Sequence, residues 1–158
     1  MTSERARVTT FVAVSPADAF DVFTTDIDAW WRRGARFRGG SNPSELCFER
    51  DAAGVGTCLV ECAAGERFEI GRVLVWEPGK RLAFEWRQRN FASGECTEVE
   101  VRFEEAPSGT RVTLEHRGWE AIHHGHPARH GLRGEAFSSM IGVHWGQLLT
   151  GYRTYVGA

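Results

Sequence analysis

Apolar residues in the last part of the chain recur every three or four positions, the spacing that places side chains on one face of an α-helix. The stretch 135–155 and the residue after it contain Phe137, Ile141, Trp145, Leu148, Leu149, Tyr152, Tyr155 and Val156 in this pattern. Each of Gly142, Gly146 and Gly151 within the stretch costs roughly 1 kcal/mol of helix propensity relative to alanine. We therefore expect a long C-terminal helix that is stabilised by packing its apolar face against the rest of the protein.

Much of the chain before this helix alternates between apolar and polar positions, which is typical of antiparallel strands with one buried face. The expected strands are residues 5–14, 45–50, 57–62, 67–77, 81–88, 97–104 and 110–117. The last three of these place on their inner faces Leu82, Phe84, Trp86, Val99, Val101, Phe103, Val112, Leu114 and His116. Residues 73–76 are apolar on both faces, so the pattern does not indicate which side of that strand is buried.

Two short helices are expected between the first and second strands. Ser15-Pro16 supplies a helix cap and a proline at the first helical position. A second helical segment, residues 26–31, ends at Trp30-Trp31, and a basic, glycine-rich loop follows it. The sequence thus predicts one α+β domain over residues 1–158. It consists of a curved antiparallel sheet of about six to seven strands, two short helices after the first strand, and the C-terminal helix lying across the sheet.

Composition narrows the class of protein. The chain is 42% hydrophobic and 25% charged with a net charge of −2, which is typical of a globular domain and gives no general reason to expect nucleic acid. No apolar run approaches the roughly 20 residues of a membrane span, and the N-terminus lacks a signal sequence. The four cysteines form no CxxC pair. We expect reduced thiols, a cytoplasmic location, no membrane partner, and a monomer or homodimer.

The order of these elements is similar to the helix-grip fold of the START/Bet v 1 (SRPBCC) superfamily. It most resembles the branch named after the Hsp90 ATPase activator homologue (AHSA1-like). The resemblance is carried by residues 12–23, 71–86 and 109–116, together with Trp145, Leu148, Leu149, Tyr152 and Tyr155. It implies a cavity between the C-terminal helix and the sheet that binds a small hydrophobic or aromatic molecule. Two alternatives remain: a protein-interaction module resembling the Hsp90 co-chaperone, and an enzyme of cyclase or aromatase type that uses the same cavity. Against the co-chaperone, the eukaryotic activators carry an additional domain for which this chain has no room.

Aromatic and other large residues that point inward are the candidates for lining such a cavity, because pockets are mostly apolar with a few polar groups. We expect Gly142, Gly146 and Gly151 to leave room for this cavity beside the C-terminal helix. The candidate ligand-binding residues are Trp30, Trp31, Trp76, Phe84, Trp86, Phe103, His116, Trp119, Met140, His144 and Trp145.

His116 and His144 are the candidates for acid–base chemistry, since imidazole titrates near neutral pH. His144 lies at the edge of the apolar helix face, so the alternative is a neutral side chain satisfied by a backbone carbonyl or by water. The sequence contains no GxSxG, HExxH, P-loop or GxGxxG motif, and we expect no cofactor.

Residues 121–130 contain four of the six histidines, which suggests a zinc or copper site. No cysteine or acidic residue has suitable spacing around them, and Gly125 and Pro127 indicate a mobile loop. We therefore favour surface histidines and expect no metal.

The segment from Trp30 to Arg38 interleaves aromatic and basic residues, as single-stranded nucleic-acid sites do. One short patch in a chain of negative net charge is weak support for that partner. We favour the rim of the cavity, solvated, with one arginine facing a carboxylate or phosphate of the ligand.

Overall fold

The computed structural model describes residues 4–39 and 43–157. Its elements confirm the predicted α+β fold, with strand ends within a few residues of those expected. In chain order they are β1 (Ala6–Val12), α1 (Pro16–Thr25), α2 (Ile27–Trp30), β2 (Glu45–Arg50), β3 (Gly56–Ala63), β4 (Glu66–Glu77), β5 (Arg81–Trp86), β6 (Thr97–Ala106), β7 (Gly109–Arg117), η1 (Trp119–Ala121), η2 (Pro127–Arg129) and α3 (Gly134–Val156).

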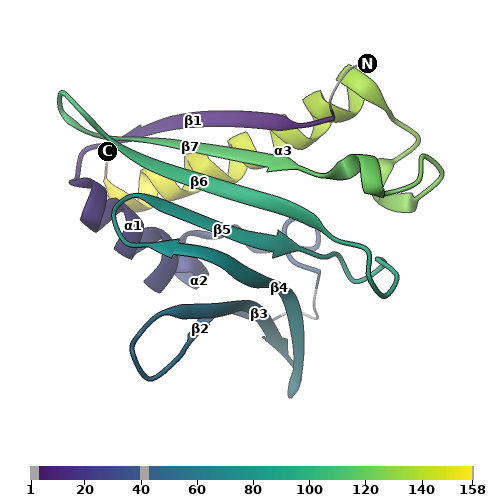
Figure 1. The fold of residues 1–158 in the computed structure, drawn as a ribbon, viewed down its shortest axis with the longest axis horizontal. Coiled ribbons are helices and arrows are strands. Elements are labelled where there is room, and N and C mark those ends of the chain that lie inside the picture. Colours follow the sequence, from purple (N-terminus) through teal and green to yellow (C-terminus); the bar gives the residue numbers. More distant parts are fainter. Residues whose placement is uncertain (1–3, 40–42, 158) are drawn as a thin grey trace.

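The strands form one antiparallel sheet in the order β1-β7-β6-β5-β4-β3-β2, and α3 lies along one of its faces (Figure 1). Helices α1 and α2 connect β1 to β2, which are the two edge strands. The pairing of β3 with β4 shifts in register between positions Leu59 and Val60 of β3. The pairing of β4 with β5 shifts between positions Val73 and Val75 of β4. Such bulges bend a strand and increase its twist. The part of the sheet formed by β2, β3 and the first half of β4 turns away from the rest (Figure 1).

Helix α3 buries the face that its periodicity predicts, from Phe137 to Tyr152. Gly151 allows a close approach, because a Cβ there would lie 3.1 Å from the carbonyl oxygen of Trp30. Tyr155 was expected on the buried face, but it is 47% exposed, and its hydroxyl donates to Asp26 Oδ2 at 3.1 Å. Tyr155 therefore lies at the edge of the buried face, beside the junction of α1 and α2, whereas Val156 still packs against the core.

The structure of β4 explains why its apolar pattern did not indicate which of its faces is buried. Phe68, Ile70, Val73 and Trp76 pack toward the core, whereas Leu74 is 48% exposed. The bulge between Val73 and Val75 changes the alternation partway along the strand. A strict period of two therefore cannot fit the whole strand.

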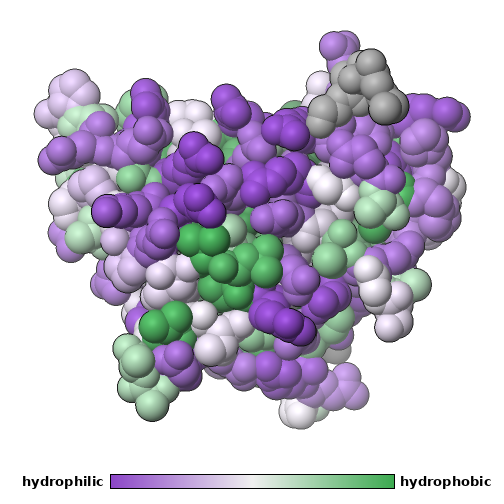
Figure 2. Space-filling model, viewed as in Figure 1, coloured by the Kyte–Doolittle hydropathy of each residue, from purple (hydrophilic) through white to green (hydrophobic). Residues whose placement is uncertain are grey.

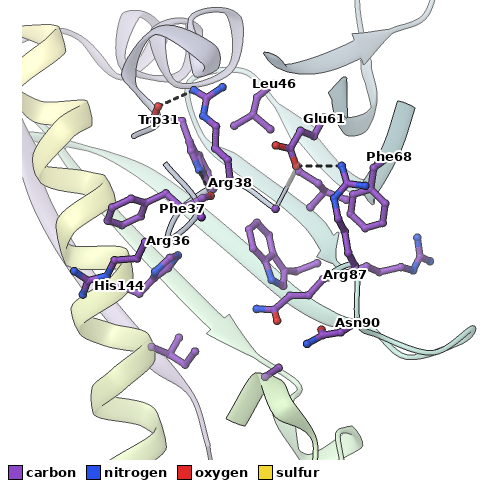
Figure 3. Close-up of a pocket in the computed structure, with 18 of the residues that line it drawn as sticks. Trp31, Arg36, Phe37, Arg38, Leu46, Glu61, Phe68, Arg87, Asn90 and His144 are labelled. Carbon is purple, nitrogen blue, oxygen red and sulfur yellow. Dashed lines mark hydrogen bonds and ion pairs between the residues drawn. The ribbon is translucent and has the colours of Figure 1, made fainter. Parts of the chain in front are cut away.

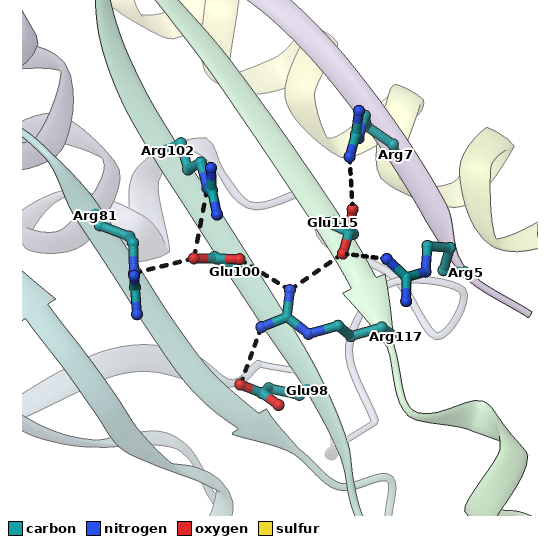
Figure 4. A network of polar contacts seen from close by, with 8 residues as sticks. All are labelled: Arg5, Arg7, Arg81, Glu98, Glu100, Arg102, Glu115 and Arg117. Carbon is teal, nitrogen blue, oxygen red and sulfur yellow. Dashed lines mark hydrogen bonds and ion pairs between the residues drawn. The ribbon is translucent and has the colours of Figure 1, made fainter. Parts of the chain in front are cut away.

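The face of the sheet opposite α3 carries a network of arginines and glutamates on β1, β5, β6 and β7 (Figure 4). Glu100 contacts Arg81, Arg102 and Arg117 at 3.0, 3.5 and 2.8 Å, and Arg117 also bonds Glu115 at 3.1 Å. Burial raises the pKa of Glu100, but the Arg117 hydrogen bond and the nearby arginine charges outweigh it, so its pKa lies below the usual value. Figure 2 shows this face as largely hydrophilic, with a smaller hydrophobic area near its middle.

No helix in the described ranges combines the length and apolar character needed to cross a membrane. The four cysteines are free thiols. Burial raises the pKa of Cys58 to about 12, so this thiol is protonated and unreactive at neutral pH.

Candidate functional site

A cavity of about 650 Å³ lies between α3 and the bent part of the sheet. This volume falls in the range of pockets that hold small molecules. Helix α3, the 31–39 segment, strands β2 to β5, the 87–90 segment and the residues around η2 all contribute to its lining (Figure 3). Exposed lining residues such as Arg36, Arg89 and Asn90 mark where the cavity meets solvent.

The bend of the sheet creates this space. At the β1 edge the helix packs closely, since a Cβ on Gly142 would lie 4.0 Å from the Ala6 side chain. At the other edge, β2, β3 and the start of β4 curve away, and α3 supplies only Met140, Ile141 and His144 to the lining. The helix glycines, expected to make this room, do not line the cavity. Strand curvature and loop placement form it instead.

Three tryptophans form and support one wall. The rings of Trp31 and Trp86, which both line the cavity, stack with their centroids 6.0 Å apart and their planes at 22°. Trp145 packs edge-on against Trp31 and Trp86 at 5.5 and 5.6 Å. Trp31 Nε1 donates to the carbonyl of Phe37 at 2.9 Å, which fixes the Trp31 ring against the 31–39 segment. The wall is therefore rigid and apolar before any ligand is present.

Four of the eleven candidate ligand-binding residues line the cavity: Trp31, Trp86, Met140 and His144. The other seven pack elsewhere in or against the core; they are Trp30, Trp76, Phe84, Phe103, His116, Trp119 and Trp145. Trp30, for example, packs against Phe23 and Tyr152 under the C-terminal half of α3. The alternation identified inward-facing residues, but it does not say which end of the interior is filled.

His116 is sealed in the core, with 2% of its surface exposed. Trp145 Nε1 donates to its Nδ1 at 2.9 Å, so the ring hydrogen sits on Nε2 and is donated to Thr97 Oγ1 at 2.7 Å. Burial, with a smaller effect of His144, lowers the pKa of His116 to about 3. Both ring nitrogens are occupied and the ring does not line the cavity. His116 thus anchors α3 to the sheet, and of the two histidines proposed for acid–base chemistry only His144 lines the cavity.

His144 lines the cavity, and its ring stacks on Phe37 with the centroids 5.3 Å apart. Burial, and then the nearby charge of Arg36, lower its pKa, so the imidazole is neutral at physiological pH. It makes no hydrogen bond with any residue that the structure describes. The backbone carbonyl considered as its partner is therefore not found in that part of the chain.

The arginines around the cavity differ in their surroundings. Arg38 was expected on a solvated rim, but it is buried and donates to Asp28 Oδ1 at 2.6 Å and to the carbonyls of Trp31 and Ser44 at 2.7 and 2.9 Å. It therefore holds the 31–39 segment against α2 and β2, as a structural residue. Arg36, two residues earlier, is exposed and forms no ion pair with a described residue.

The histidine-rich segment contains the short helix η2 and is partly buried, so the expectation that all its histidines lie at the surface is wrong. His126 is buried, with Nδ1 accepting from the Ala128 amide at 3.0 Å and Nε2 lying 3.1 Å from the carbonyl of Asn90. Arg129 is fully buried and pairs with Glu4. The other histidines of the run, His123, His124 and His130, are exposed as expected. Among described residues, no group of three or more histidine, cysteine or acidic side chains is arranged to hold a metal ion.

Several lining residues were not among the candidates, including Phe37, Leu46, Glu61, Phe68, Ile70 and Ile141. Leu46 and Ile141 carried a usable signal, because they lie at inward positions of a predicted strand and of the helix face. Arg36 and Phe37 lie in a segment without periodicity, so no pattern in the sequence could assign their direction.

An antiparallel sheet that holds a C-terminal helix, with a cavity between them, defines the class of helix-grip proteins. Residues 13–139 match the family described as Activator of Hsp90 ATPase homolog 1-like protein, and the chain belongs to this family. This confirms the family resemblance drawn from the sequence. No curated protein sequence matches the chain.

Solved structures share the fold at low sequence identity. The Aha1 dimer from Colwellia psychrerythraea has a TM-score of 0.62 and 17% identity, covering 96% of this chain and 95% of its own. Protein CV1439 from Chromobacterium violaceum has a TM-score of 0.61 and 14% identity, with coverage of 98% and 99%. CalU16 from Micromonospora echinospora has a TM-score of 0.60 and 17% identity, with coverage of 97% and 74%. These similarities extend over nearly the whole chain and concern the fold.

Proposed function

We propose that this protein binds a small hydrophobic or aromatic molecule in the cavity between α3 and the sheet. The observation that carries the proposal is a space of about 650 Å³ whose lining includes Trp31, Trp86 and Phe37. The fold of this superfamily typically holds hydrophobic ligands, which supports the same conclusion.

The physical basis is the transfer of apolar surface out of water. Each square ångström of apolar surface removed from water stabilises a complex by roughly 25 cal/mol. An aromatic or aliphatic ligand also gains edge and face contacts with the two stacked tryptophans. Because Trp31 and Trp86 are already fixed by their neighbours, little ordering is required when the ligand binds.

Thermal unfolding against a panel of sterols, fatty acids, flavonoids and aromatic polyketides tests the proposal. A ligand present at 100 times its dissociation constant stabilises the folded state by about 2.7 kcal/mol, which raises Tm by roughly 5–10 °C for a chain of this length. Trp86→Ala should remove most of that shift, because it deletes a wall of the cavity.

Two control variants separate loss of the wall from loss of the fold. Trp86→Phe makes the side chain smaller but keeps an aromatic ring in the wall, and the indole Nε1 that it removes has no hydrogen-bond partner among the described residues, so it should retain most of the shift. Leu74→Ala lies on the exposed side of β4 and should retain all of it. A high Tm that no compound in the panel changes would count against a ligand-binding cavity.

The family description favours one alternative, an interaction with an Hsp90-type chaperone. We expect the purified protein to leave the ATPase rate of Hsp90 unchanged and to sediment separately from it. Addition of increasing amounts to a steady-state ATPase assay measures the first, and analytical ultracentrifugation measures the second. A saturable rise in ATPase rate would replace the ligand-binding proposal with a co-chaperone role.

A further inference from the structure

Among the described residues, each charged side chain that lines the cavity forms an ion pair with a side chain of opposite charge, with a single exception. Arg38 pairs with Asp28 at 2.6 Å, and Arg87 pairs with Glu69 and Glu85 at 3.0 and 3.1 Å. Arg89 lies 3.5 Å from the carboxylate of Glu61, the one acidic residue among the described lining residues. Glu61 lies on the side of the cavity away from α3 (Figure 3). These arginines have protein counter-charges, so a ligand anion would have to compete with a carboxylate for each of them.

Arg36 is the exception. It lines the cavity and is exposed, and no described acidic residue lies within ion-pair distance of it. Its guanidinium carbon lies 5.6 Å from the centroid of the Phe37 ring, which places the cation against an aromatic surface. One positive charge at the cavity lining therefore has no protein partner in the described part of the chain.

His144, a residue of α3, lies at the same side of the cavity as Arg36. Its ring stacks on Phe37, and Figure 3 shows Arg36, Phe37 and His144 grouped together. The imidazole has no hydrogen-bond partner among the described residues, and in its neutral form it offers one N–H donor. A cation without an ion pair and a donor without a hydrogen bond, among the described residues, thus lie beside the apolar wall.

We propose that the ligand of this cavity is an amphipathic molecule with a carboxylate, which binds Arg36 and His144 while its apolar body packs against Trp31 and Trp86. This inference rests on the proposed function, since it names the chemical class of the same ligand. A guanidinium binds a carboxylate through two parallel hydrogen bonds. One unpaired arginine balances one negative charge, so a monocarboxylate fits the site better than a phosphate dianion.

The test compares acids with alcohols of the same carbon skeleton: dodecanoic acid with dodecanol, and 1-pyrenebutanoic acid with 1-pyrenebutanol. Isothermal titration calorimetry or pyrene fluorescence gives Kd for each compound with the full chain. A charge-assisted hydrogen bond that replaces a solvated one changes affinity by about tenfold or more. We expect each acid to bind at least that much more tightly than its alcohol, with the difference decreasing at higher salt.

Variants of Arg36 identify the group responsible. Arg36→Ala should remove the advantage of the acids, about tenfold in Kd, and leave the alcohols within about twofold. Arg36→Lys should restore part of that advantage, because lysine keeps the charge and lacks the planar fork. Arg32→Ala is the matched control, since Arg32 also lies 5.6 Å from the Phe37 centroid but does not line the cavity.

The outcomes separate this inference from the function on which it rests. If none of the four compounds binds but a compound of the thermal-unfolding panel does, the carboxylate assignment fails and ligand binding stands. If no compound of either set binds, both proposals fail. If the alcohols bind as tightly as the acids, or if Arg32→Ala weakens the acids as much as Arg36→Ala does, the carboxylate assignment is overturned while ligand binding stands.

Discussion

Replacing Glu4 with glutamine should lower the free energy of unfolding by about 3–5 kcal/mol, because it leaves a buried arginine without its counter-charge. Arg129 is 0% exposed, and its Nη1 and Nη2 donate to the two carboxylate oxygens of Glu4 at 2.7 and 2.8 Å. The amide of Gly134, at the start of α3, donates to the same carboxylate at 2.8 Å. The Arg129 hydrogen bond, opposed by burial and aided by Gly134, lowers the pKa of Glu4 to about 2.

Urea unfolding at pH 7, monitored by tryptophan fluorescence, measures this effect. Glu104→Ala is the control, since Glu104 and Arg111 form an ion pair in which both side chains are about half exposed. Pairs of that kind contribute about 0–1 kcal/mol. A loss below about 1 kcal/mol for Glu4→Gln would show that Arg129 finds another partner or becomes hydrated. Loss of the Glu4–Arg129 pair should also affect the cavity, because Ala128 and His130, on either side of Arg129, line it.

Acid should destabilise the protein through His116. The folded state holds this imidazole neutral with a pKa of about 3, whereas an unfolded chain binds the proton near pH 6.5. Because the folded pKa is the lower one, the stability from His116 is complete above pH 6.5 and decreases as the pH falls from there toward 3. The slope for one such group is roughly 1.4 kcal/mol per pH unit, so lowering the pH to 5 removes about 2 kcal/mol.

Urea unfolding at pH 7 and pH 5, on the wild type and on His116→Gln, isolates this contribution. The variant should be less stable at pH 7, because it alters the hydrogen bonds to Trp145 and Thr97, and it should lose about 2 kcal/mol less than the wild type between the two pH values. His144→Gln serves as a second reference, since the pKa of His144 is also lowered by burial. The same pH dependence in wild type and His116→Gln would contradict a neutral, buried His116.

The pH range of this measurement lies above the range in which the paired carboxylates Glu100 and Glu115 titrate. The pKa of Glu100 and that of Glu115 are both below the usual value, because the arginines around each of them outweigh burial. Their contribution to stability is therefore lost at a lower pH than the range from 7 to 5. The first loss of stability on acidification should thus report the histidines.

The fold was predictable because its elements follow simple periods. Strand β7 alternates between apolar and polar residues over its whole length, and α3 repeats apolar residues every three or four positions. Each pattern depends only on the geometry of one element, so it can be read without knowing the neighbours. The patterns also identified inward-facing residues, including Trp86, Ile141 and the buried His116.

The extent of the cavity was not predictable in this way. It depends on bulges at Leu59–Val60 and Val73–Val75 that bend the sheet, and on a segment without periodicity that brings Arg36 and Phe37 beside α3. Inward residues near the bend line an open space, whereas Phe103 on β6 and Trp30 on α2 also point inward but fill the core. Alternation gives a direction relative to one strand and contains no information on the distance to the opposite wall.

Pairs of residues far apart in the chain were decided by the tertiary structure alone. Glu4 and Arg129 lie 125 positions apart, and the buried position of each is stable because the other is present. The histidine-rich segment packs against the rest of the chain in the same way, since Arg129 and His126 contact groups outside it. The sequence by itself determined the elements, the family and the apolar interior. Tertiary contacts decided which histidines and arginines line the cavity and which of these are paired, because burial and pairing depend on partners that local patterns do not specify.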